Sequence, residues 1–79
     1  MFETKYVRTS NNEIIVFTEL IQHKYFKDWE PISAGFISFS ADKNGEVFCK
    51  CYGESVSLKL KSMEQDTLLA NRQILGRMM

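Results

Sequence analysis

Residues 33–52 read SAGFISFSADKNGEVFCKCY and contain the clearest turn in the sequence. Asp42-Lys43-Asn44-Gly45 separates two segments rich in aromatic and β-branched residues, which favour strands. Asn-Gly supplies the positive φ angles that a tight hairpin turn requires. We therefore predict that residues 33–40 and 46–52 form an antiparallel β-hairpin. Gly35 has no side chain to pack, so its position inside the first strand predicts a bulge or a bend.

Two further strand regions precede this hairpin. Residues 5–8 and 13–17 flank the polar cluster Thr9-Ser10-Asn11-Asn12, which predicts a first hairpin because asparagine tolerates the left-handed conformation of a reversal. Residues 14–17 are apolar at four consecutive positions, so we expect that strand to be covered on both faces and central in its sheet. Residues 18–25 are expected to form a short helix capped by its first residue, a threonine.

The C-terminal third predicts one strand and one helix. Residues 56–61 alternate between apolar and polar side chains, which is typical of a strand with one buried face. Ser62-Met63-Glu64-Gln65 matches a capping box, in which serine and glutamine each bond the other's backbone amide. This motif predicts a helix that begins at Met63. Gly76 is a suitable C-terminal stop.

These elements predict one small α+β domain over residues 1–79, because a chain of 79 residues is too short for two cores. We expect a curved antiparallel sheet of about five strands in meander order. A short helix follows the second strand, and the C-terminal helix packs on the sheet. The alternative is a small open β-barrel closed by the last helix.

Composition limits the classes of function. Ten basic residues balance ten acidic ones, which removes the argument from net charge for binding nucleic acid or a membrane surface. The sequence contains no apolar run long enough for a signal peptide or a transmembrane helix. We therefore expect a cytoplasmic protein with no membrane partner.

Two cysteines and one histidine are the candidate metal ligands or nucleophiles. Cys49 and Cys51 lie two positions apart in a strand, about 6.5 to 7 Å from each other, which is too far for a disulfide. We expect free, buried thiols; a zinc site shared between two copies is the alternative. His23 is expected at the surface. Since the common catalytic motifs are missing, we predict no enzyme activity, metal, cofactor or small-molecule substrate.

The C-terminal helix has more apolar surface than one sheet can cover. At 100° per residue, one apolar stripe consists of Met63, Thr67, Ala70 and Ile74. Other apolar residues lie outside this stripe, so we predict a non-enzymatic interaction module that contacts a second copy, as a homodimer, or another protein. The predicted interface residues are Leu68, Leu69, Arg72, Leu75 and Met78.

The alternative function is weak binding of nucleic acid. Lysines alternate with aromatic residues in residues 24–29, as on surfaces where bases stack on rings and phosphates meet lysines. Acidic residues flank this segment and nearly cancel its charge, so we favour the interaction module. The candidate residues are Lys24, Tyr25, Lys27, Trp29, Lys59 and Lys61.

Several segments resemble short uncharacterised proteins of bacteria and their phages. The resemblance spans most of the chain and implies a small soluble domain of bacterial or phage origin. It implies no activity. The segments are Tyr6-Val7-Arg8-Thr9, Asn12-Glu13-Ile14-Ile15-Val16-Phe17, Ser33-Ala34-Gly35-Phe36-Ile37, Cys51-Tyr52-Gly53-Glu54-Ser55 and Ser57-Leu58-Lys59-Leu60-Lys61-Ser62.

Overall fold

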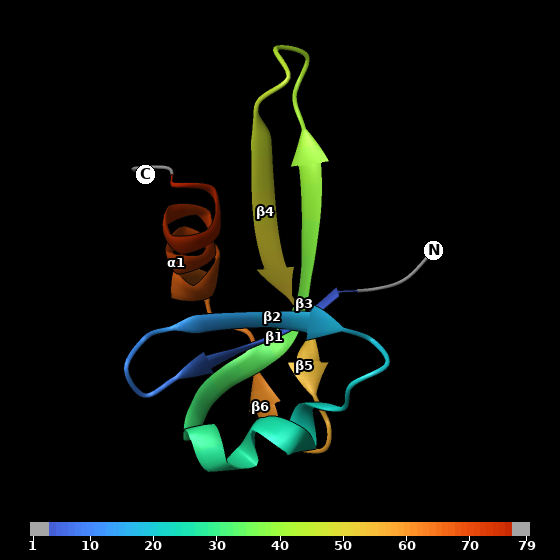
Figure 1. Ribbon diagram of the computed structural model, residues 1–79, viewed down its shortest axis with the longest axis vertical. Coiled ribbons are helices and arrows are strands. Elements are labelled where there is room, and N and C mark those ends of the chain that lie inside the picture. Colours follow the sequence, from blue (N-terminus) through green and yellow to red (C-terminus); the bar gives the residue numbers. More distant parts are fainter. Residues whose placement is uncertain (1–3, 77–79) are drawn as a thin grey trace.

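The computed structural model describes residues 4–76 and has the predicted α+β architecture (Figure 1). A four-stranded antiparallel sheet has the order β2-β1-β3-β4, and β5 and β6 form a small second sheet. A 3-10 helix, η1, precedes β3, and the C-terminal helix α1 packs on the larger sheet. The bounds are β1 Thr4–Thr9, β2 Ile14–Thr18, η1 His23–Trp29, β3 Pro31–Ala41, β4 Val47–Tyr52, β5 Glu54–Ser55, β6 Leu60–Lys61 and α1 Glu64–Leu75.

The strand order differs from the predicted meander. β1 lies between β2 and β3, so β2 is an edge strand and the prediction of a central position for it is wrong. The apolar run in β2 instead reflects cover on both faces. Ile14 packs against one core cluster and Ile15 against the other, since neighbouring residues of a strand point to opposite faces.

β3 and β4 form the predicted hairpin, and their outer half extends beyond the rest of the sheet (Figure 1). Gly45 has a φ of 81°, and its N–H donates to the Asp42 carbonyl oxygen at 3.0 Å. The chain has no bulge at Gly35, which pairs with Tyr6; the register shift between β1 and β3 lies at Arg8 and Thr9. A Cβ at Gly35 would collide with the backbone of Tyr52, so close approach explains this glycine.

Two predicted elements differ in the structure. Residues 56–59 form a turn and not a strand, because the Ser55 hydroxyl accepts the Leu58 N–H at 3.3 Å and Lys59 has a φ of 58°. Only Leu60–Lys61 of that segment is a strand. A short helix does follow β2, as predicted, but its predicted bounds, residues 18–25, and its predicted cap are wrong, since Thr18 ends β2 and η1 begins five residues later, at His23.

The two faces of the large sheet carry different core clusters. Beneath α1, the first cluster consists of Tyr6, Ile37, Cys49, Cys51 and Ala70. On the opposite face, the second cluster consists of Val7, Phe17 and Ala34, covered by Phe26, Leu58 and Leu60. Thus η1 and the β5–β6 hairpin cover one face and α1 covers the other. Within residues 4–76, no helix is long and apolar enough to cross a membrane.

Candidate protein-interaction site

α1 is held on the sheet mainly by polar side chains. Its buried residues are Asp66, Ala70 and Asn71, so the inward side combines Ala70 of the predicted apolar stripe with two polar residues. Met63 and Ile74, two members of that stripe, are 45% and 39% exposed. The stripe therefore faces the sheet at its middle, where Ala70 is buried and Thr67 bonds β4, and it is exposed at its two ends.

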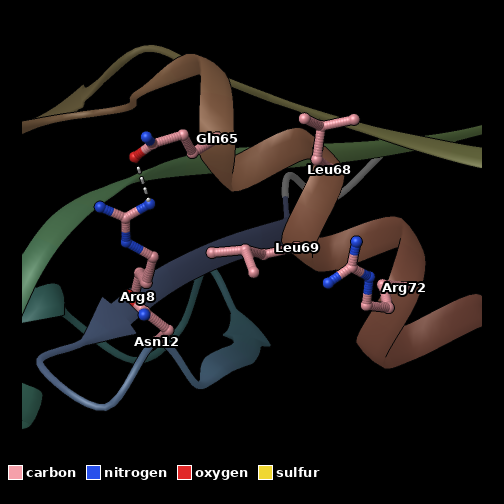
Figure 2. Close-up of a pocket in the computed structure, with 6 residues that line it drawn as sticks. All are labelled: Arg8, Asn12, Gln65, Leu68, Leu69 and Arg72. Carbon is pink, nitrogen blue, oxygen red and sulfur yellow. Dashed lines mark hydrogen bonds between the residues drawn. The ribbon is translucent and has the colours of Figure 1, made fainter. Parts of the chain in front are cut away.

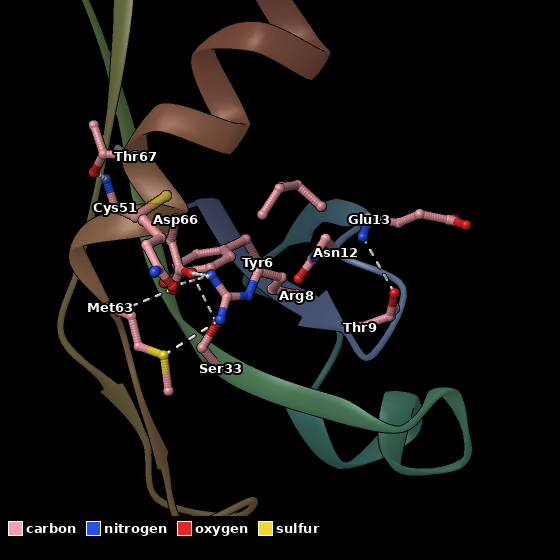
Figure 3. A network of polar contacts seen from close by, with 12 residues as sticks. Tyr6, Arg8, Thr9, Asn12, Glu13, Ser33, Cys51, Met63, Asp66 and Thr67 are labelled. Atoms are coloured by element: carbon pink, nitrogen blue, oxygen red, sulfur yellow. Dashed lines mark hydrogen bonds and ion pairs between the residues drawn. The ribbon is translucent and has the colours of Figure 1, made fainter.

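Asp66 is the centre of the buried network in Figure 3 and is 0% exposed. One carboxylate oxygen, Oδ1, accepts from the Ser33 hydroxyl at 2.9 Å and pairs with Nη1 of Arg8 at 2.9 Å. The other, Oδ2, accepts from the Tyr6 hydroxyl and from the Met63 N–H. Burial, together with the Asp66 carboxylate, raises the pKa of Tyr6 far above its ordinary value. Asp66 therefore joins the start of α1 to β1 and β3.

The same contacts correct the predicted start of the helix. Met63 is the N-cap, and Asp66 at the third helical position reaches back to its N–H at 2.9 Å. This is the bond expected from Gln65 to Ser62, displaced by one residue, and the Asp66 N–H donates to the Met63 carbonyl oxygen at 2.9 Å in place of a serine hydroxyl. Gln65 instead accepts from Nη1 of Arg8 at 3.3 Å. The C-terminal stop at Gly76 is confirmed, since its φ is 66° and its N–H donates to the Arg72 carbonyl oxygen.

Asn71 and Thr67 bind the outer edge of β4. Asn71 accepts the Cys49 N–H through Oδ1 at 3.0 Å and donates through Nδ2 to the Cys49 carbonyl oxygen at 2.9 Å. The Thr67 hydroxyl accepts the Cys51 N–H at 3.0 Å. These side chains use the backbone groups that another strand would use. α1 therefore protects this edge of the sheet from pairing with another chain.

Cys49 and Cys51 are free and buried, as predicted. Burial raises the pKa of both thiols. For Cys51, burial and the Asp66 charge raise the pKa to about 12, with a partial offset from hydrogen bonds to Tyr6 and Thr67. A thiol that stays protonated is a poor nucleophile. Among the residues that the structure describes, no group of three or more histidine, cysteine, aspartate or glutamate side chains could hold a metal ion.

His23 is only 5% exposed, so the prediction of a surface histidine is wrong. Its Nε2 lies 2.9 Å from the Gly35 carbonyl oxygen, and its ring meets Phe17 and Phe36 edge-on. Burial lowers the pKa of His23; the nearby Lys5 charge acts in the same direction, and the Gly35 carbonyl opposes both. His23 is thus part of the packing beneath η1.

The outward side of α1 carries the predicted interface. Leu68 is 47% exposed and Arg72 is exposed. Leu69 and Leu75 are half-buried, and Leu75 packs against the first cluster. Met78 lies outside the described residues. Of the predicted set, Leu68 and Arg72 therefore have the accessibility that an interface requires.

A cavity of about 300 Å³ opens between α1 and the turn that follows β1 (Figure 2). Gln73 holds this turn against α1, because its side chain accepts the Ile14 N–H at 2.8 Å and donates to the Asn12 carbonyl oxygen at 2.6 Å. Arg8 is 4% exposed, and its Nε is buried without a partner in the described part of the chain. The lining residues are Arg8, Asn12, Gln65, Leu68, Leu69 and Arg72.

The sequence predicts three site residues that line this cavity, Leu68, Leu69 and Arg72. It does not predict Gln65, also on α1, or Arg8 and Asn12, which come from β1 and its following turn. Only the tertiary contact between that turn and α1 brings the two groups together. The one signal for Arg8 was its position in a predicted strand, directly after Tyr6 and Val7.

The candidate nucleic-acid residues also lie at the surface. All six, from Lys24 to Lys61, are exposed. Phe26 of η1 and Leu58 and Leu60 of the β5–β6 hairpin pack in the same cluster, so the two segments share one face of the sheet. Asp28 and Glu30 are exposed in the same region, which keeps its charge mixed.

Comparisons of the chain with protein-family models, with curated proteins and with solved structures give no significant match. The resemblance to short proteins of bacteria and phages stays a prediction. The interpretation of the site therefore depends on its own geometry.

Proposed function

We propose that this protein is a non-enzymatic, cytoplasmic interaction module that self-associates through the outward side of α1. The observation that carries this proposal is the exposure of Leu68, which is 47% accessible beside the cavity. The inward side of the same helix is already occupied by polar contacts with the sheet. Burial of a leucine side chain stabilises a contact by about 1.5 to 3 kcal/mol when it is complete, so covering Leu68 favours association.

The state of the buried titratable groups supports a non-enzymatic role. Burial keeps Cys51 protonated, and both carboxylate oxygens of Asp66 accept hydrogen bonds from groups of the fold. His23 directs Nε2 to a backbone carbonyl. Each of these side chains contributes to packing or docking, which accounts for its burial without a substrate.

Sedimentation velocity tests self-association. We expect a monomer–dimer equilibrium at protein concentrations between about 10 µM and about 1 mM. The dimer should be weak because a contact limited to one helix is smaller than about 1,200 Å². Leu68→Gln should weaken the dimer about tenfold, because each copy loses apolar contact at the interface. Val56→Gln is the control, since Val56 is 83% exposed in the β5–β6 turn, away from α1. A wild-type protein that stays monomeric throughout this range contradicts the proposal.

A second candidate is weak binding of single-stranded nucleic acid by η1 and the β5–β6 hairpin. Tyr25 and Trp29 are 70% and 56% exposed, and the second cluster places them on the same face as Lys59 and Lys61. Exposed rings beside lysines are the combination that stacks bases and contacts phosphates. This arrangement is the observation that favours the candidate.

Fluorescence anisotropy with labelled single-stranded DNA and RNA at low salt tests this second candidate. Replacement of Lys59 and Lys61 by glutamine should weaken binding and reduce its dependence on salt. Replacement of Lys43 and Lys50 by glutamine is the control, because both are exposed on the β3–β4 hairpin. If the wild-type protein binds neither nucleic acid at low salt, this candidate is wrong.

A further inference from the structure

The order of side chains along the outward side of α1 points to the partner. We propose that the partner is a second copy of this chain, and that the two α1 helices pack antiparallel about a two-fold axis at Leu68. Glu64 of each copy then pairs with Arg72 of the other. This inference rests on the proposed self-association and specifies its geometry.

Glu64, Leu68 and Arg72 form one row on α1, because residues four positions apart are neighbours on a helix surface. At 1.5 Å per residue, the two charged residues lie about 6 Å on either side of Leu68 along the helix axis. A two-fold axis through Leu68 that reverses the helix direction places each acid opposite the other copy's base. It also brings the two exposed leucines together at the centre.

A parallel arrangement of the same row is unfavourable. It would place Glu64 opposite Glu64 and Arg72 opposite Arg72, and like charges in contact disfavour association. The order acid, leucine, base is therefore self-complementary in the antiparallel direction alone. This charge pattern is the reason to favour a second copy over a partner of different chemistry.

The three residues of this row are available for such a contact. Glu64, Leu68 and Arg72 are all exposed. Over residues 4–76, the structure pairs neither charged member with an opposite charge, whereas Arg8 pairs with Asp66. Neighbouring polar residues are already used within the subunit, since Thr67 binds β4 and Gln73 binds the β1–β2 turn. The outward row is thus distinct from the side chains that hold the helix in place.

Figure 2 shows two members of the row, Leu68 and Arg72, beside the cavity. Leu68 and Leu69 both line the cavity, but Leu69 extends toward Arg8, whereas Leu68 extends in a different direction. Leu68 can therefore contact another molecule while Leu69 keeps its position beside Arg8 in the cavity.

The expected dimer is weak and sensitive to salt. α1 has 12 residues and is about 18 Å long, so a contact limited to this helix is smaller than a standard interface. Exposed ion pairs contribute about 0.2 to 1 kcal/mol each. The symmetric contact contains two of them. Their effect should be greatest at low ionic strength, where screening is weak.

Charge reversal tests the register directly. In the homodimer, Glu64→Arg creates two arginine–arginine pairs and Arg72→Glu creates two glutamate–glutamate pairs. Each variant should therefore raise the dissociation constant about tenfold at low salt. The double variant Glu64→Arg/Arg72→Glu restores opposite charges and should return to within about twofold of wild type. A mixture of the two single variants should form a heterodimer more tightly than either variant pairs with itself.

Sedimentation velocity measures all of these species, and circular dichroism checks that each variant is folded. The matched controls are Asp28→Arg and Lys24→Glu on η1, which make the same charge changes at exposed positions on the opposite face. Weakening by both single variants, together with rescue by the double variant, supports the antiparallel register, because a parallel wild-type pair already opposes like charges and would not be weakened by them. If wild type dimerises but the single variants are not weakened, the antiparallel register is wrong while self-association stands, even if the mixed variants form a heterodimer. A monomeric wild type overturns both.

Discussion

The two faces of the sheet hold their covering elements by different means. On one face, α1 is positioned by directional hydrogen bonds from Asp66, Thr67 and Asn71 to side chains and backbone of the sheet. On the other, η1 and the β5–β6 hairpin are positioned by apolar packing, for example of Phe26 against the second cluster. Directional bonds determine the rotation of a helix about its axis, whereas apolar contact depends mainly on volume.

This difference connects the fold to the proposed function. A helix that packs by apolar contact turns its leucines inward. In α1, Asp66 and Asn71 share the inward side with Ala70, and Leu68, which lies outside the apolar stripe, is exposed. Polar docking thus leaves an apolar side chain available for another molecule.

The largest loss of stability should come from removal of the Asp66 charge, at the centre of the contact between α1 and the sheet. Asp66→Asn leaves Arg8 buried without an opposite charge and removes an acceptor of the network. We expect a loss of about 3 to 5 kcal/mol in the free energy of unfolding, a large share of the stability of a small domain. Urea unfolding followed by circular dichroism measures it.

The control for this variant is Asp28→Asn, an exposed position on η1 that should change stability by less than about 0.5 kcal/mol. The double variant Arg8→Met/Asp66→Leu removes both buried charges together and should recover part of the loss. Equal stability of the Asp66→Asn and Asp28→Asn variants would show that polar docking does not hold α1.

A smaller loss of stability should separate docking by directional hydrogen bonds, as in α1, from docking by apolar packing, as in the β5–β6 hairpin. Substitutions that nearly conserve volume test this difference. Asn71→Leu keeps the approximate volume but leaves the Cys49 N–H and carbonyl oxygen without their side-chain partners. We expect a loss of about 2 to 3 kcal/mol and more aggregation, because the edge of β4 becomes available to other chains. Urea unfolding and light scattering measure the two consequences.

Leu60→Met on the opposite face is the matched control. Leu60 packs on the second cluster, where a volume-conserving apolar change should cost less than about 1.5 kcal/mol. Equal losses in the Asn71 and Leu60 variants would remove the distinction between directional and apolar docking.

The parts of the fold that follow from local chemistry could be predicted. Gly45 and Gly76 have the expected positive φ, which few other residues tolerate, whereas Asn44 does not have the positive φ predicted for it. The edge position of β2 could not be predicted, since it depends on β3 returning beside β1. Residues 56–59 alternate between apolar and polar side chains as a strand does, but they form a turn because the Ser55 hydroxyl accepts the Leu58 N–H.

The candidate site could be predicted in part for the same reason. The surplus apolar surface of α1 identified Leu68 from the sequence, and the structure leaves this residue exposed. The burial of Asp66 and Asn71 beside Ala70 was not predictable from hydrophobic periodicity, because both residues are polar. Their burial depends on Arg8, Tyr6 and the β4 backbone, which lie far away in the sequence.

The smallest effect we expect is a dependence of stability on pH that comes from His23, on the face of the sheet covered by η1. The pKa of buried His23 is lowered from 6.5, so as the pH falls below 6.5 the unfolded chain binds a proton that the folded protein does not. The free energy of unfolding should therefore decrease from pH 6.5 toward about pH 5, above the range where most carboxylates titrate. Urea unfolding at each pH measures this slope.

His23→Gln is the control that assigns this response. Glutamine keeps a donor for the Gly35 carbonyl oxygen but does not titrate, so its stability should be nearly constant over the same range. Tyr6 and Cys51 should not contribute, because their raised pKa values move their titration further into the alkaline range. Parallel decreases in wild type and variant would place the acid-sensitive group elsewhere. A flat profile in the variant alone would assign acid sensitivity to the face packed by apolar contact.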